Sequence, residues 1–413
     1  IPQKECYWRV YLKAEASEGF APIYTQTAAV DPTRTHAAVN TYPETDYFGH
    51  IYLANHHNIV DATSRKHSVS DFALNQDGEY ALMSNNPTTL HFTRRPAVAP
   101  DGMVYLVDEG TAKRDANGYL VNGPADFDNA GLWLLNPADA ASGNATLTPF
   151  LGEGNYEATS AVAFYGKGAN TLLYKTNTYD EFTTHGGAAN GPTDNGYAVY
   201  QIGKANQSLL HTAPANRTVV PITGDAGGNF SIAPTAQGVW LCLHRDIQQT
   251  VTEADNVENI ILSCYNHKGA RVFASLDNPG NFHNYVQAAP GGAMTISADE
   301  QYLYMVNHDG DIVKFQITWG VSTPAGMQKR ISLDQDPTPS LKYVETYATN
   351  YKAISSLAID YAGNIIATAG ERYGNNGTIR DSQQLVVYTL PKADNQIEVP
   401  APVSQTIPSR EQN

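Results

Sequence analysis

Carboxylate, amide and imidazole side chains recur along the chain at intervals of 63 to 69 residues, at Asn40, Asp108, Asn177, His244, Asn307 and Glu371. Oxygen and nitrogen atoms of these kinds bind hard cations such as Ca²⁺, or form hydrogen bonds with sugar hydroxyl groups. Four more polar residues lie within two positions of them: Glu109, Asp246, His308 and Arg372. We take all ten as candidate ligand-binding residues, with Asp108 and Glu371 as candidate ligands of a divalent cation. Polar residues also end any strand that leads into a surface loop, so the pattern alone does not establish a site.

The elements that must position these residues are pairs of short β-strands. The segment PAVAPDGMVYLVDEG (Pro96–Gly110) has the pattern of a strand, a turn and a second strand that runs into Asp108. Five other segments share this pattern and begin at Ala28, Ala161, Phe230, Met294 and Ser356. The turn residues are Pro32, Pro100, Tyr165, Pro234, Ala298 and Tyr361, spaced by 68, 65, 69, 64 and 63 residues. Such even spacing predicts six copies of one unit.

A third strand follows in every unit, at Gly49–Asn55, Gly131–Pro137, Gly196–Gly203, Asn259–His267, Gly310–Ile317 and Gln384–Pro391, and a fourth follows in most units. Four strands in a unit of about 65 residues are typical of a β-propeller. We therefore predict an all-β fold, a six-bladed β-propeller over residues 1–400 with a C-terminal tail at 401–413.

Two details of the ring depend on segments that do not fit the repeat. Because the last unit ends after its third strand, the spare strand Cys6–Ala14 is expected to become its fourth strand and close the ring. The segment Ser68–Asn86 has a hairpin pattern of its own. It fits either an elaborated first blade or a separate blade, which would make seven.

The predicted connections between second and third strands are long in four units and rich in Tyr, Asn, Asp and Gly. All of them would lie on the same face of a propeller, together with the candidate residues. Long loops on one face of a rigid scaffold are where proteins usually recognise ligands. This composition suits a polar ligand.

The sequence pattern AVAPDGMVYLVD followed by GLWLLNP resembles that of six-bladed propellers of the broad NHL/TolB-like group. The segment LVVYTLPKADNQIEVPAP is similar to the ends of secreted or lipid-anchored propeller proteins that are common in Bacteroidetes. The resemblance extends from Tyr7 to about Pro400 and implies a secreted or cell-surface location. Propellers of this group include lactonases, lyases and binding modules, so the resemblance implies no single activity.

The composition excludes some classes of partner. The chain has 26 Lys and Arg against 41 Asp and Glu, a formal net charge of −15, which argues against nucleic acid and anionic membranes as partners. No apolar run is long enough to span a membrane. The N-terminal residues lack the apolar region of a signal peptide, so either the chain is cytosolic or a leader has been removed.

Three cysteines are too few for a disulfide framework and are not spaced as a zinc site. Cys242 and Cys264 fall in strand patterns that could be neighbours in one sheet. There they would either form a disulfide or remain buried thiols. Cys6 has no evident partner.

Three isolated motifs carry weaker predictions. Residues 126–131 begin like a calcium-binding loop but lack the closing Glu. Residues 55–58, with two adjacent histidines, follow a predicted third strand, which would place them on the face opposite the long connections. Arg94 and Arg95 precede the second unit, where they could lie near the central channel or form a surface ion pair.

These observations lead to three hypotheses for a monomeric protein. The first is a secreted or cell-surface binding propeller that recognises a glycan or another extracellular ligand on its long-loop face. The second is a metal-dependent hydrolase, lactonase-like or lyase-like, with Asp108 and Glu371 as ligands and His244 or His308 as acid/base. The third is a scaffold that binds another protein.

Overall fold

The computed structural model describes residues 21–27, 38–46, 50–58, 67–74, 80–88, 95–108, 111–112, 127–128, 131–137, 147–151, 161–177, 196–205, 209–221, 229–244, 260–275, 293–307, 309–320, 337–349, 353–360, 363–372 and 379–389. These residues form β-strands joined by turns, together with a short 3-10 helix, η2 (Gly168–Asn170). Within these ranges no helix has the length and the apolar character that crossing a membrane requires.

The strands form six four-stranded antiparallel sheets, which we number in chain order. Sheet 1 contains β2 (Ala38–Thr45), β3 (Ile51–Asn58), β4 (His67–Leu74) and β5 (Tyr80–Thr88). Sheet 2 contains β6 (Ala97–Val98), β7 (Val104–Asp108), β10 (Gly131–Leu135) and β11 (Thr148–Leu151). Sheet 3 contains β12 (Val162–Tyr165), β13 (Leu172–Asn177), β14 (Gly196–Gln201) and β15 (Arg217–Pro221).

The other three sheets have the same build. Sheet 4 contains β16 (Asn229–Pro234), β17 (Val239–His244), β18 (Ile260–Tyr265) and β19 (Arg271–Ala274). Sheet 5 contains β20 (Met294–Ile296), β21 (Tyr302–Val306), β22 (Ile312–Gly320) and β23 (Thr338–Tyr347). Sheet 6 contains β24 (Ala353–Ile359), β25 (Ile365–Arg372), β26 (Ile379–Thr389) and β1 (Ala21–Thr27). A small hairpin of β8 (Thr111–Ala112) and β9 (Phe127–Asp128) lies between β7 and β10 in the chain.

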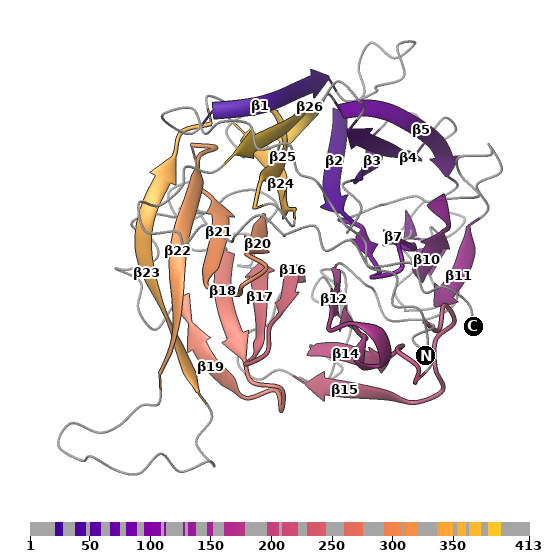
Figure 1. Ribbon diagram of the computed structural model, residues 1–413, viewed down its shortest axis with the longest axis vertical. Coiled ribbons are helices and arrows are strands. Elements are labelled where there is room, and N and C mark those ends of the chain that lie inside the picture. Colours follow the sequence, from indigo (N-terminus) through magenta and orange to yellow (C-terminus); the bar gives the residue numbers. More distant parts are fainter. Residues whose placement is uncertain are drawn as a thin grey trace, which may run out of the picture.

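Sheet 6 combines strands from the two ends of the chain. β1 pairs with β26 in antiparallel register from Ala21↔Thr389 to Thr27↔Gln384. Figure 1 shows β1 beside β26, at the edge of the sheet that β24 and β25 complete. The strand predicted for this position, Cys6–Ala14, lies outside the described residues, and the strand that occupies the position is β1.

Sheet 1 differs from the predicted pairing. The first turn of this sheet lies at residues 46–50, where Asp46 Oδ1 accepts a hydrogen bond from the His50 backbone N–H at 2.9 Å. The segment predicted as two strands around Pro32 therefore contributes to β2, the first strand, and Asn40 lies within it, opposite His56 of β3. The predicted hairpin at Ser68–Asn86 supplies β4 and β5, so it forms no sheet of its own.

Sequence explains which strands lie inside and which lie at edges. Val104 to Asp108 of β7 are all buried, because β7 is central in its sheet and both of its faces are covered. Prolines occur within the described strands only where the strand lies at the edge of its sheet. An edge strand pairs on one side only, so it tolerates a residue that has no backbone N–H to donate. Examples are β1, β2, β5, β15, β16 and β23. Pro43 in β2 is one of these prolines.

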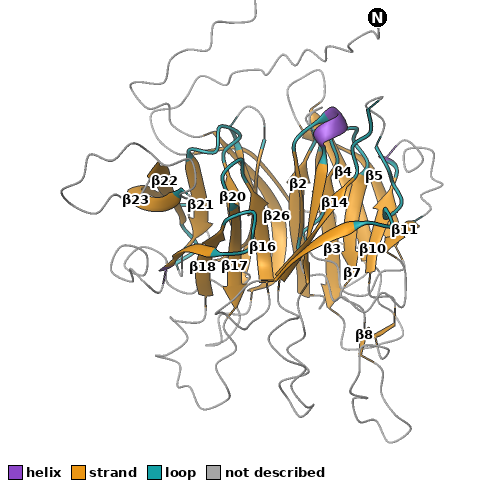
Figure 2. Cartoon of the chain, turned by 90° about the horizontal axis from the view of Figure 1, so that it is seen from below, coloured by secondary structure: helices purple, strands orange, loops and turns teal. Residues whose placement is uncertain are grey.

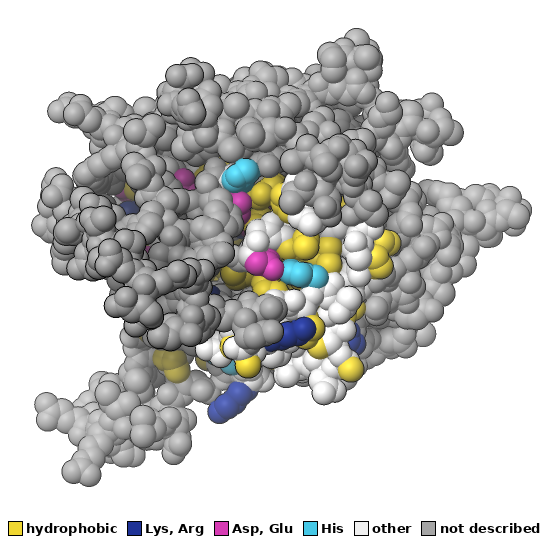
Figure 3. Space-filling model, turned by 45° about the vertical axis from the view of Figure 1, so that its right-hand side comes forward, with side chains coloured by type: hydrophobic (Ala, Val, Ile, Leu, Met, Phe, Trp, Pro, Cys, Tyr) yellow, Lys and Arg dark blue, Asp and Glu magenta, His cyan; other side chains and the backbone are white. Residues whose placement is uncertain are grey.

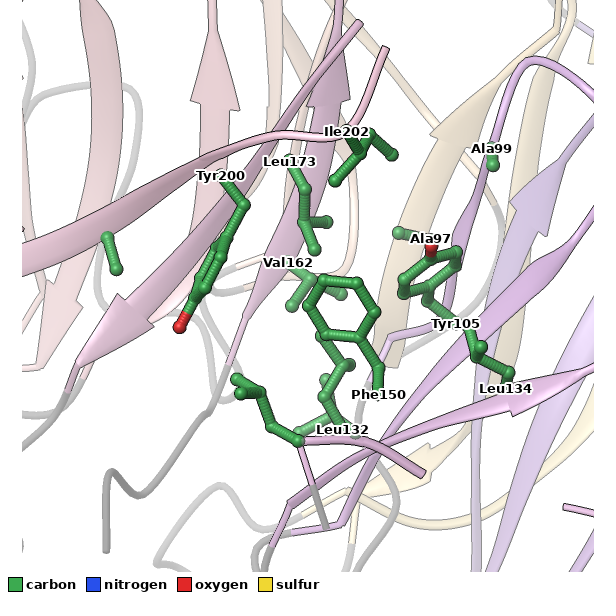
Figure 4. Close-up of a cluster of buried hydrophobic side chains, with 13 residues drawn as sticks. Ala97, Ala99, Tyr105, Leu132, Leu134, Phe150, Val162, Leu173, Tyr200 and Ile202 are labelled. Carbon is green, nitrogen blue, oxygen red and sulfur yellow. The ribbon is translucent and has the colours of Figure 1, made fainter. Parts of the chain in front are cut away.

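Apolar clusters fill the space between neighbouring sheets. Separate clusters lie between sheets 1 and 2, 2 and 3, 3 and 4, 4 and 5, 5 and 6, and 6 and 1. Figure 4 shows the cluster between sheets 2 and 3, where Phe150 lies between Tyr105 and Tyr200, with ring centroids 5.4 and 5.6 Å away. Successive residues of one strand face opposite neighbours, because strand side chains alternate. Sheets packed in this way around a common centre confirm the predicted all-β propeller (Figure 1).

The two ends of the sheets differ. At the long-loop end, the second strand of each sheet leads to the third through residues 59–66, 109–130, 178–195, 245–259, 307–311 and 373–378. At the short-turn end, first and second strands join through residues 46–50, 99–103, 166–171, 235–238, 297–301 and 360–364. Figure 2 shows η2 and the described turns at one end of the sheets and β8 at the other.

Candidate functional site

Five of the six recurring candidate residues lie at or directly after the ends of second strands. Asp108, Asn177 and His244 are the last residues of β7, β13 and β17, and each pairs with the first residue of the third strand. Asn307 directly follows β21, and Glu371 and Arg372 end β25. Their backbones therefore lie at the long-loop end of five sheets. Asn40 does not join them, because it lies in the first strand of sheet 1.

The residues that hold the equivalent place in sheet 1 belong to β3. Asn55 to Asn58 form the last half of this second strand, which leads to the connection at residues 59–66. The prediction that residues 55–58 follow a third strand and lie on the opposite face is wrong. It failed because the first strand pair of this sheet was placed too early in the sequence.

Asp108 is the candidate whose surroundings are best defined. Its side chain has no exposed surface, although it ends a strand. A buried carboxylate is stable only with polar partners, and Asp108 has such an interaction. Burial of this degree leaves no surface of Asp108 for a ligand to contact in this structure.

Asn307 has a structural role that its position in the sequence did not reveal. Its Oδ1 accepts hydrogen bonds from the backbone N–H groups of Asp309 and Asp311, at 2.9 and 2.8 Å. The Asn307 backbone N–H donates to the Asp311 carbonyl, which closes the short connection between β21 and β22. The side-chain oxygen is thus committed to a turn, a use that is common for Asn at such positions.

The proposed metal ligands, Asp108 and Glu371, lie in sheets 2 and 6, with sheet 1 between them. Within the described part of the chain, no group of three or more His, Cys, Asp or Glu side chains could hold a metal ion. Glu109, Asp246 and His308 lie outside the described residues. Their roles, and those of the side chains of His244 and Glu371, remain predictions.

Cys242 and Cys264 lie on neighbouring strands and share one face of sheet 4, as predicted. Both are free thiols, and both are buried in the cluster between sheets 4 and 5. Burial raises the pKa of the Cys242 thiol to about 12 and also raises the pKa of Cys264. The structure therefore contains two buried thiols and no disulfide at this pair.

An ion pair joins three sheets at the first strands. Arg95, two residues before β6, donates through Nε to Oε2 of Glu44 in β2 at 2.9 Å, and its Nη2 lies 2.9 Å from the same oxygen in an ion pair. Its Nη1 donates to the carbonyl oxygen of Met294 in β20, at 2.8 Å. Arg95 thus connects sheets 2, 1 and 5. Of the two predicted roles for Arg95, the ion pair is confirmed.

A chain of three polar groups crosses the boundary between sheets 2 and 3 at the short-turn end. The Tyr105 hydroxyl lies 2.9 Å from His211 Nδ1, and His211 Nε2 lies 2.7 Å from Oδ2 of Asp101. Burial acts to raise the pKa of Asp101, but the hydrogen bond and charge of His211 hold that pKa below its ordinary value. Burial, and then the charge of Asp101, raise the pKa of Tyr105 far above its usual range.

This carboxylate–imidazole–hydroxyl order resembles that of a catalytic triad, but its hydroxyl is not available as a nucleophile. Tyr105 has no exposed surface and its pKa is raised, so it stays protonated. Figure 3 shows acidic side chains beside histidines on the described surface, among exposed apolar groups. No sequence pattern indicates this cluster, because His211 is more than 100 residues from its partners.

Glu300 occupies a strained position at the same end. Its φ is +60°, in the left-handed region where the corresponding turn residues of sheets 2 and 6 are Gly102 and Gly363. Its Oε2 accepts a hydrogen bond at 2.9 Å from the Ala236 backbone N–H of sheet 4. Burial, followed by the charge of Glu300 and a hydrogen bond to it, raises the pKa of Tyr165 in sheet 3. Glu300 thus joins the turns of sheets 4 and 5.

The fold defines this chain as a β-propeller protein. No protein-family model matches it, and a search of curated proteins finds no match. It is similar to the WD40 β-propeller domain of Doa1, at 9% identity and a TM-score of 0.45, over 91% of this chain and 99% of that one. The β-propeller domain of Cps50 (Swd1) from Myceliophteria thermophila has 9% identity and a TM-score of 0.43, over 90% and 100% of the two chains.

A luciferin-regenerating enzyme is also similar, at 9% identity and a TM-score of 0.41, over 89% of this chain and 95% of that one. At such low identity and TM-score, these likenesses carry no argument about activity. Only the chain's own residues can indicate its function.

Proposed function

We propose that the chain is a binding propeller that recognises a glycan or another extracellular ligand on its long-loop face. In this proposal the six sheets are the blades of a six-bladed ring, which β1 closes by pairing with β26. The packing of sheet 6 against sheet 1 supports closure, since Ile51 and Leu53 share a cluster with Leu385 and Val387. The Thr45 hydroxyl also donates to the carbonyl oxygen of Ile359, at 3.3 Å.

The observation that carries the proposal is the placement of the connections. Strand bounds assign residues 109–130, 178–195 and 245–259 to the long-loop end of sheets 2, 3 and 4, which are consecutive. Together they give that end far more chain than a sheet connection needs, since two residues are enough to join antiparallel strands. Long connections at the end of a rigid scaffold are typical of a recognition surface.

The short-turn end lacks this excess in its first-to-second connections. Its turns are closed by their own side chains: Asp360 Oδ1 accepts from the Asn364 N–H at 2.8 Å, and the Thr235 hydroxyl donates to the Gly238 carbonyl at 2.8 Å. Side chains used in this way stabilise the scaffold and have less capacity left for a ligand.

We also propose that the protein works outside the cytoplasm, secreted or at the cell surface. The support is its resemblance to secreted propellers and a polar long-loop composition that suits glycans. An excess of acidic residues is compatible with this location, where solubility depends on net charge.

Thermal unfolding with a panel of oligosaccharides tests the proposal. A ligand at about 100 times its Kd stabilises the native state by about 2.7 kcal/mol, which for a chain of this size raises Tm by about 3 °C. The β8–β9 hairpin provides a clean excision, because Ala112 pairs with Phe127 and residues 113–126 can be replaced by Asn-Gly. We expect the excised variant to keep its Tm and lose the shift.

A matched control removes chain at the opposite end. Gly320 pairs with Thr338, so residues 321–337 between β22 and β23 can also be replaced by Asn-Gly. This variant should retain the ligand-induced shift. A shift that survives the first excision and disappears in the second would place recognition at the short-turn end. No shift with any oligosaccharide would contradict glycan binding.

A further inference from the structure

The guanidinium of Arg95 has hydrogen-bonding capacity that its protein contacts do not use. A guanidinium carries five N–H groups. In Arg95, Nε–H donates to Glu44 Oε2, Nη2 lies 2.9 Å from the same oxygen in an ion pair, and one Nη1–H donates to the Met294 carbonyl. This leaves one N–H on each Nη without a partner among the described residues. The Arg95 side chain is 21% exposed, so part of it is open to solvent.

The backbone of Arg95 lies toward the long-loop end of sheet 2, whereas its partner Glu44 lies beside the short turn of sheet 1 at residues 46–50. Ala97 pairs with Tyr105, so the chain at Arg95 runs beside the last residues of β7, near Asp108. The partners of Arg95 belong to the first strands of sheets 1 and 5. These first strands pack against the first strands of neighbouring sheets: β2 against β6 and β24, and β20 against β16 and β24. The guanidinium therefore lies among the first strands, where it contacts Glu44 of sheet 1 and Met294 of sheet 5.

We propose that the two free N–H groups of Arg95 bind a carboxylate of the ligand, so that the recognised glycan is an acidic sugar such as a uronic acid. This inference rests on the proposed function and names its ligand class. Two donors on adjacent nitrogens of a planar group match the two oxygens of a carboxylate.

Charge favours a carboxylate over a phosphate. Glu44 already balances the charge of Arg95, and Glu44 is itself held by the Thr45 N–H, which donates to its Oε1 at 3.0 Å. A dianionic phosphate would therefore bring two uncompensated charges into a protein of net charge −15. A carboxylate brings one charge and gains two charge-assisted hydrogen bonds.

Lysine cannot reproduce this arrangement. In Arg95→Lys, the ammonium keeps the charge that pairs with Glu44 but has no planar fork for a second carboxylate. We expect Arg95→Lys to raise the Kd for an acidic sugar about 10-fold or more, the equivalent of one lost hydrogen bond to a charged group. Arg217→Lys is the matched control, because Arg217 lies in β15, the outer strand of sheet 3, and donates to the Tyr200 hydroxyl.

The measurement is titration calorimetry with galacturonic acid oligosaccharides, their methyl esters and neutral galactose oligosaccharides. We expect the acid to bind the unmodified protein and Arg217→Lys alike, and the methyl ester to bind at least about 10-fold more weakly. The ester comparison needs no variant. If Arg95→Lys fails to fold, the double variant Glu44→Gln/Arg95→Gln removes both charges together, and it should bind acid and ester with equal affinity.

Equal binding of the acid and the ester by the unmodified protein would overturn this inference, as would an unchanged Kd in folded Arg95→Lys. Binding of neutral oligosaccharides alone would refute the acidic ligand and leave the proposed glycan function in place. Binding of none of these sugars would overturn the acidic ligand, and the broader panel described above would then decide the proposed function.

Discussion

Replacement of His211 by Ala should destabilise the protein, because the buried hydroxyl group of Tyr105 loses its hydrogen-bond partner. Tyr105 has no exposed surface, and among the described residues its hydroxyl contacts only His211 Nδ1. An unsatisfied buried polar group costs about 1–3 kcal/mol. His211 is 23% exposed, so water can enter where it is removed, which favours the lower half of this range. For a chain of this length the loss corresponds to about 1–3 °C in Tm.

Tyr105→Phe separates this cost from the loss of packing. It removes the hydroxyl and leaves Nδ1 of a partly exposed imidazole, which water can reach, so we expect a loss of about 0.5–1.5 kcal/mol. In the double variant no hydroxyl remains to be buried, so its loss should be smaller than the sum by about 1 kcal/mol. Urea unfolding followed by circular dichroism measures all three. His267→Ala, an exposed histidine that contacts the Ala236 carbonyl, is the control and should change stability by less than about 0.5 kcal/mol.

Additive losses in the double variant would refute the reasoning, because they would mean that the hydroxyl of Tyr105 does not depend on His211. The pH profile gives a second check. The pKa of Asp101 is lowered in the folded state, so its interaction with His211 stabilises the protein above pH of about 4 and is lost as pH falls below that value. His211→Ala should therefore show a shallower loss of stability in acid.

Two further predictions concern strain and burial. Glu300→Gly should be more stable than Glu300→Ala by about 1 kcal/mol in urea unfolding. Both variants lose the hydrogen bond to Ala236, but only the alanine variant keeps a strained φ of +60°. Equal stability of the two variants would exclude strain at this turn. In a Cys6→Ser background, Cys242 and Cys264 should resist Ellman's reagent until the protein unfolds, and rapid modification of the native protein would contradict their burial. Because burial raises the pKa of Cys242 to about 12, its contribution to stability should be complete below pH of about 8.5 and disappear as pH rises toward 12.

The repeat pattern predicted sheets 2 to 5 well, since alternating apolar strands and Asp- or Gly-containing turns carry their own local signals. Sheet 1 was placed wrongly because its first turn contains the aromatic residues of TDYFGH, while Pro32 marked a turn elsewhere. Pro43 also weakened the strand signal of β2, although an edge strand tolerates it. Local signals therefore failed where a proline and a turn lay close together.

The positions of the candidate site residues could be predicted only in part from the sequence. Strand ends could be located, so the backbones of Asp108 and Asn177 lie where they were predicted. The use of the Asn307 side chain in its own turn depends on a geometry that a strand-end pattern does not reveal. The contacts of His211 and Arg95 join residues 51 to 199 positions apart, and only the folded chain brings them together.

The pairing of β1 with β26 has a consequence for the order in which the protein is made. β1 leaves the ribosome more than 350 residues before β26, so during translation its ladder has no partner and its edge is open to other chains. Sheets 1 to 5 can form as they emerge, whereas sheet 6 must wait for the last strand of the described chain. A nascent chain stalled before Ile379 would therefore carry an unpaired N-terminal strand, which makes late translation the stage at which this protein most needs protection from aggregation.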